Sequence, residues 1–179
     1  MKKRIFILLL CFVQLLIAQD KELPWREDFK LTYSDFEGNP DKNHPYAAIT
    51  YSGMSYGFSA EVVNDKVAVD YNVECFFVAN KSWMKMYLAD ENLLAHEQLH
   101  FDITELYARK LRKLLSEMTF SENVKSEMRN AYEKCHEEKK AYQNLYDEET
   151  NHSKIRLKQK EWELKVAKEL DTLKEFASK

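Results

Sequence analysis

The stretch DENLLAHEQLHFDITELYARKLRKLL, residues 90–115, decides the fold of this chain. It contains no Gly or Pro and is rich in Leu, Glu, Ala, Lys and Arg, which are good helix formers. Asp90 and Glu91 stand where a helix N-terminus is expected. The sequence therefore predicts one long helix that begins near Asp90 or Glu91. Its apolar positions are Leu93, Leu94, Ile103, Leu106, Leu111, Leu114 and Leu115.

His96-Glu97-Gln98-Leu99-His100 forms an HExxH motif inside this helix. Four residues on an α-helix turn through about 400°, so the rings of His96 and His100 project from one face and can bind one metal ion. Glu97 lies beside that face, in the place of a general base. Neutral imidazoles favour zinc. The motif predicts one Zn²⁺ per chain, with Asp102 facing away from the histidines.

A catalytic zinc site usually has three protein ligands and one open position, so a third ligand must come from elsewhere. Three histidines remain in the chain. His44, beside Pro45, is typical of a turn, and His136 stands among charged residues on a helix face. His152 follows the point where the second helix is expected to end or bend. His152 and the acidic residues Asp147, Glu148 and Glu149 are the candidate third ligands.

The rest of the chain after residue 88 is also expected to be helical, since it lacks Gly and Pro. Thr119-Phe120-Ser121 predicts a break, with a second helix from Ser121 toward Tyr146. Apolar residues then recur at Trp162, Val166, Leu170 and Leu173, at helical spacing. This C-terminal amphipathic helix, within residues 154–179, is expected to cover the core or to bind a protein partner.

The part before the helix favours strands. Residues 47–52, 55–60, 67–71 and 75–78 are rich in β-branched and aromatic side chains. Turn residues at 37–41, 52–53 and 64–65 are expected to separate short antiparallel strands.

The first eighteen residues have the layout of a secretory signal peptide. Lys2, Lys3 and Arg4 precede an apolar run that ends at Ala18 and is shorter than a membrane span. We expect cleavage and export to the periplasm or beyond, with no membrane span in the mature chain. A retained anchor, or a lipoprotein joined through Cys11, is the alternative.

The mature chain, residues 19–179, suits a single domain: 19–88 mainly β, 89–153 helical with the metal site, and 154–179 the C-terminal helix. It carries 24 basic against 30 acidic residues, a net charge of −6, and so lacks the basic excess of a nucleic-acid-binding protein. Cys75 and Cys135 form one disulfide or remain two buried thiols.

Three blocks of sequence resemble the bacterial domain-of-unknown-function 922 family, secreted proteins related to the zincin-like metallopeptidases. They are YSDFEGNP at 33–40 followed by AAIT at 47–50, LAHEQLHFDI at 94–103, and Tyr146-Asp147 with Thr150 and His152. Ser153 stands where the family usually has glycine. The resemblance implies that His152 is the third ligand and that Asp147 orients a ligating imidazole.

The expected fold is α+β and zincin-like: a small N-terminal antiparallel sheet packed on the HExxH helix, followed by two further long helices. The expected function is hydrolysis of a peptide or protein substrate by a zinc-activated water, with Glu97 as general base. Tyr146 is a candidate donor to the oxyanion, and the strand next to the helix would bind substrate at its edge. A non-catalytic, zinc-stabilised module of the cell envelope is the alternative.

Overall fold

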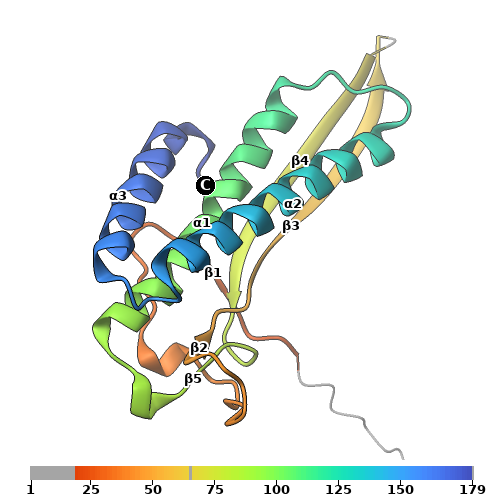
Figure 1. Cartoon of the computed structure of the whole chain (residues 1–179). Coiled ribbons are helices and arrows are strands. Elements are labelled where there is room, and N and C mark those ends of the chain that lie inside the picture. The colour runs from red at the N-terminus through yellow and green to blue at the C-terminus, as the bar shows by residue number, and fades with distance from the viewer. Residues whose placement is uncertain (1–18, 65, 179) are drawn as a thin grey trace, which may run out of the picture.

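The computed structural model describes residues 19–64 and 66–178 of the chain (Figure 1). The predicted signal peptide, including Cys11, lies outside the described residues. Among the described helices, none combines the length and the apolar character that crossing a membrane requires. Over the described residues the architecture is α+β with three α-helices, as the sequence predicted, but it has two small antiparallel sheets where one was expected.

A long hairpin dominates the β part. Strand β3, Ser52–Val63, pairs along its whole length with β4, Lys66–Val78, and Asn64 takes a left-handed conformation in the turn between them. The predicted turn at residues 64–65 is confirmed at Asn64. The break expected at Ser52-Gly53 lies two residues earlier, at Thr50-Tyr51, between the short strand Ala48–Ile49 and β3, so β3 continues through Gly53. The segments at 67–71 and 75–78 were expected as two strands, but they are parts of one continuous strand, β4. A paired neighbour supplies ladder hydrogen bonds that outweigh the weak local preference of Gly53.

The remaining strands are short. β1, Glu22–Pro24, pairs with the end of β4, and β2, Ala48–Ile49, pairs with β5, Trp83–Met84. Short 3-10 turns occupy Tyr33–Asp35, Met86–Leu88 and Lys174–Phe176. The pairing of β2 with β5 brings residues 46–50 beside the segment that leads into the first helix.

Helix α1, Glu91–Glu117, begins where the sequence predicted, with Asp90 as its N-cap: the Asp90 side chain accepts a hydrogen bond of 2.7 Å from the Leu93 N–H. The chain leaves the helix at Met118, which confirms the break at 119–121. Helix α2, Val124–Thr150, begins three residues later than expected, and α3 spans Arg156–Thr172.

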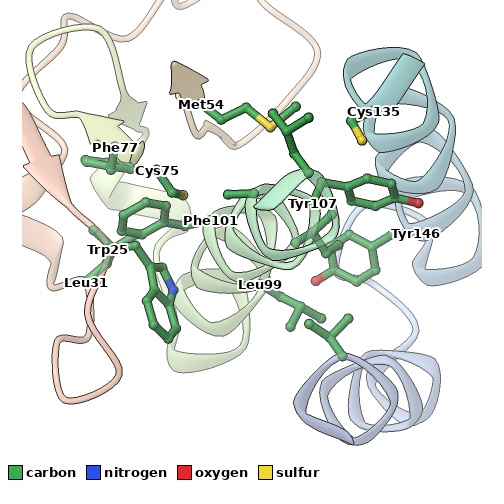
Figure 2. Packing of buried hydrophobic residues seen from close by; sticks show 14 of the residues in the cluster. Trp25, Leu31, Met54, Cys75, Phe77, Leu99, Phe101, Tyr107, Cys135 and Tyr146 are labelled. Carbon is green, nitrogen blue, oxygen red and sulfur yellow. The ribbon is translucent and has the colours of Figure 1, made fainter. Parts of the chain in front are cut away.

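The core lies on both sides of α1. Figure 2 shows Phe77 and Cys75 of β4 on one side of the helix and Cys135 and Tyr146 of α2 on the other. Both cysteines are buried free thiols, so the structure shows no disulfide between them.

Helix α3 packs against α1 and α2 and closes the third side of the core (Figure 1). Trp162 and Val166 are fully buried there. The expectation that the C-terminal helix covers the core is therefore confirmed. Trp162 and Val166 of the expected partner face are therefore occupied by the chain's own core, whereas Leu170 and Leu173 are only partly buried, and a partner for this helix stays a prediction.

Candidate metal centre

Helix α1 carries the two histidines of the motif side by side. One helical turn separates His96 from His100, and their Nε2 atoms lie 3.3 Å apart. Both side chains point into the space between α1 and α2, and His96 is only 2% exposed. Asp102 accepts hydrogen bonds from Trp25 Nε1 at 2.8 Å and Gln98 Nε2 at 2.9 Å, which confirms that it faces away from the histidines.

Asp147 reaches the same point from α2. Its Oδ1 lies 3.1 Å from the Nε2 atom of each histidine, so these three residues form a group that could hold a metal ion. Tetrahedral zinc bonds of about 2.0–2.1 Å place neighbouring ligand atoms about 3.3–3.4 Å apart. The separations of 3.1–3.3 Å in this group therefore fit one small ion bound by all three atoms.

The carboxylate and the imidazoles change one another's protonation. Burial alone would raise the pKa of Asp147, but hydrogen bonds and charge interactions with His100 and His96 lower it well below its usual range. Burial would likewise lower the pKa of His100, whereas Asp147 and Glu97 raise it. The group therefore favours positive charge at its centre, which a bound divalent cation would also supply.

Glu97 lies at the edge of this group, in a cavity of about 240 Å³. The side chain is 4% exposed, and within the described residues its carboxylate makes no hydrogen bond to a protein group. The cavity is lined by Tyr46, Ala47, Ala48, Ile49, Thr50, Leu93, His96, Glu97, His100, Gln143, Asp147 and His152. The carboxylate of this largely buried residue opens on the cavity without a protein partner, so it is available to a water or substrate in this space.

His152 borders the cavity without joining the three-residue group. Its Nδ1 is 3.6 Å from Oδ1 of Asp147, its side chain is 41% exposed, and its ring packs on Tyr46 at 4.6 Å. Asn151, His152 and Ser153 are all left-handed, with φ of 47°, 49° and 71°. This turn ends α2, as expected, and holds His152 beside Asp147. The geometry favours Asp147 as third ligand over His152.

The other acidic candidates do not reach the cavity. Glu148 is exposed, and Glu149 accepts a hydrogen bond of 2.8 Å from Trp162 Nε1. His44 lies in a turn and His136 is exposed on α2, in agreement with the sequence analysis.

The assignment of Tyr146 as oxyanion donor needs correction. Its side chain is completely buried, and its hydroxyl donates to Gln159 Oε1 at 2.7 Å and to the His96 carbonyl at 3.3 Å. Its ring stacks on the His96 ring at 4.6 Å. The hydroxyl is thus hydrogen-bonded to the His96 backbone and to Gln159, and Tyr146 does not line the cavity.

Two neighbours of the site were not expected from the sequence. Gln159 of α3 contacts His96, with 3.1 Å between its Oε1 and the His96 Nδ1. Gln143 of α2 donates to the His100 carbonyl at 3.1 Å. Gln143 lies four residues before Asp147, a spacing that places both on one face of a helix, whereas nothing local to Gln159 indicates its role.

Comparison with known proteins finds one family model that matches part of the chain. Residues 78–153 match the family described as "Bacterial protein of unknown function (DUF922)", which supports the family assignment made from the sequence. The matched segment includes α1, α2 and the turn at 151–153. No curated protein and no solved structure matches the chain.

Proposed function

We propose that this protein is an exported, zinc-dependent hydrolase of peptide bonds, with a zincin-like packing of its HExxH helix. One observation carries the proposal: three metal-binding atoms meet within 3.3 Å of one another in a cavity that also holds the unpaired carboxylate of Glu97. Two histidines and one carboxylate form a ligand set that catalytic zinc sites use.

His96, His100 and Asp147 would hold the ion. Zinc bound there supplies Lewis-acid chemistry: it activates water for attack and polarises a carbonyl oxygen. The burial of His96 and Glu97 suits this chemistry, because electrostatic interactions are stronger in the low-dielectric surroundings of buried side chains.

Glu97 would act as the general base. It follows His96 directly on α1, and its carboxylate faces the cavity rather than a protein donor. From there it can accept a proton from the attacking water and pass it to the leaving amine. Because Tyr146 does not face the cavity, we assign His152 to contact the substrate beside the scissile bond.

The substrate would lie along residues 46–50. Strand β2 pairs with β5 on one side, and Thr50 joins its end to α1 by a hydrogen bond of 3.3 Å to the Glu97 carbonyl. A peptide that paired with the other side of β2 would run past the metal ligands. Exposed Tyr46 would contact its side chains at the rim.

Replacement of Glu97 by Gln tests the mechanism. The amide keeps the shape of the side chain but cannot accept the proton, so peptide hydrolysis should fall by at least about 10²–10⁴-fold. Zinc content, measured by elemental analysis, should stay at one ion per chain. Glu148→Gln, at an exposed acidic residue near the site, is the matched control and should keep full activity. Full activity in Glu97→Gln would refute the mechanism.

A further inference from the structure

We propose that Gln159 positions His96 for metal binding. The C-terminal helix α3 then contributes to the metal centre as well as packing on the core. The inference rests on the metal site of the proposed function. It concerns how that site is held, and it does not depend on which bond is hydrolysed.

Gln159 is completely buried and all its polar atoms have partners. Its Oε1 lies 3.1 Å from His96 Nδ1 and accepts from the Tyr146 hydroxyl at 2.7 Å. Its Nε2 donates to Oε1 of Glu163 at 3.2 Å. The contact with Glu163 fixes which way the amide points, because a carboxylate can accept only from the NH₂ end. The oxygen therefore faces His96.

This orientation determines the tautomer of His96. An amide oxygen can only accept a hydrogen bond, so the Nδ1 of His96 must carry the proton. In the neutral ring, Nε2 is then left with a bare lone pair. That lone pair faces Oδ1 of Asp147 at 3.1 Å, and two acceptors at this distance repel each other unless a proton or a metal cation lies between them. Gln159 thus presents His96 in the form that binds a metal.

Contacts of α3 and of the 3-10 turn that follows it, Lys174–Phe176, keep Gln159 in place. Arg109 of α1 donates to the Leu170 carbonyl at 2.8 Å, and Arg112 donates to the Phe176 carbonyl at 2.9 Å. On the α2 side, the hydroxyl of Tyr142 donates to Glu169 at 2.7 Å. These bonds fix the far end of α3, so the helix cannot rotate or slide without breaking them. The position of Gln159 follows from the docking of the whole helix.

Hydrogen-bond acceptors behind a ligating histidine raise its basicity and fix its ring, and their removal typically costs 10–100-fold in metal affinity. Gln159 lies outside the segment 78–153 that matches the family, so the match itself assigns it no role. We therefore expect a comparable loss when its oxygen is removed.

The experiment compares zinc affinity in the purified wild-type protein, Gln159→Met and Gln159→Glu, by competition with a chromophoric chelator. Met has a similar size but cannot accept a hydrogen bond, so zinc should bind about 10–100-fold more weakly. Glu restores an acceptor and should recover most of the affinity. The visible spectrum of the Co²⁺-loaded protein should change in Gln159→Met and return toward the wild type in Gln159→Glu.

Tyr146→Phe is the matched control. It removes the other donor to the same oxygen but keeps the ring against His96, so zinc affinity should change little. Urea unfolding of the metal-free variants separates stability from metal binding. Should Gln159→Met fail to fold, Glu163→Ala tests the same contact, because it frees the amide to turn, and it should also weaken zinc binding.

Equal zinc affinity in the wild type and in folded Gln159→Met, or no recovery in Gln159→Glu, would overturn the role of Gln159 and leave the metal site standing. A wild type that binds no zinc would overturn the site itself. A wild type that binds zinc without hydrolysing peptides would contradict only the proposed function.

Discussion

Helix α1 carries two buried polar clusters that differ in how their charges are balanced. Near its N-terminus, His96 and His100 meet Asp147. Two turns further on, Oε1 of Glu105 lies 3.0 Å from both Arg109 and Arg112, and Arg112 also donates to the Val73 carbonyl.

The second cluster is satisfied almost entirely by the protein itself, because opposite charges and backbone carbonyls pair with one another. In the first cluster, the Nε2 atoms of both histidines and Oδ1 of Asp147 point at one another, so the cluster needs protons on the imidazoles or a bound cation to hold it together. Burial of a charged group costs desolvation free energy in either cluster. Burial of charge alone therefore does not separate the two clusters, whereas the convergence of three metal-binding atoms is found in the first and supports the proposed metal site.

The largest effect should come from removal of one acceptor of the first cluster. Asp147→Ala should reduce bound zinc from one ion per chain to none, because two imidazoles alone form an incomplete site. His152→Ala should keep the ion. Elemental analysis of both variants decides between the two candidate third ligands: zinc lost from His152→Ala and retained in Asp147→Ala would reverse the assignment.

Glu105→Ala removes the carboxylate of the second cluster. It should lower the free energy of unfolding by about 3–5 kcal/mol, because the guanidinium groups of Arg109 and Arg112 stay buried without their counter-ion. Urea denaturation of the metal-free protein measures this. Glu117→Ala removes an exposed partner of Lys113 on the same helix and should have little effect. A Glu105 variant as stable as the Glu117 variant would show that the cluster is not structural.

Added zinc should stabilise a variant of the second cluster but not a variant of the first. At free zinc about 100-fold above its dissociation constant, the wild type should gain about 2.7 kcal/mol of stability. A Glu105→Gln protein should gain the same amount from its lower starting point, whereas Asp147→Ala should gain nothing. Thermal unfolding with and without zinc gives the three values. An equal gain in Asp147→Ala would place the ion elsewhere.

The smallest effect concerns the turn beside the first cluster. Ser153 has a left-handed backbone with φ of 71°. This conformation has a conformational energy roughly 1–2 kcal/mol higher for a residue with a Cβ, whereas glycine adopts it at very little cost. Ser153→Gly should therefore raise the free energy of unfolding by about 1 kcal/mol and leave zinc binding unchanged. Ser153→Ala keeps the Cβ and should bring no such gain. A loss of zinc in Ser153→Gly would mean that the strained turn serves the site.

Local sequence was a good guide wherever neighbouring residues decide the outcome. The start of α1 at Asp90, its end before Thr119, the turn at Asn64 and the pairing of His96 with His100 all depend on spacing along one element. The continuity of β3 through Gly53 could not be seen in this way, because it depends on the partner strand β4.

Residues brought together from distant segments were harder to assign. The sequence left Asp147, Glu148, Glu149 and His152 open as third ligands, since helix ends alone do not show which side chain reaches a point on another helix. Tyr146 was expected at the substrate, but its hydroxyl is turned toward Gln159, thirteen residues further along the chain.

The sequence by itself determined the helical second half, the hairpin turn and the paired histidines with Glu97 beside them, because helical periodicity and turn chemistry act over a few residues. Only the tertiary structure decided that Asp147 meets the two histidines and that Gln159 contacts His96. These contacts span about fifty to sixty residues along the chain. They exist because the packing of α2 and α3 against α1 buries apolar surface, and that packing fixes where each polar side chain ends.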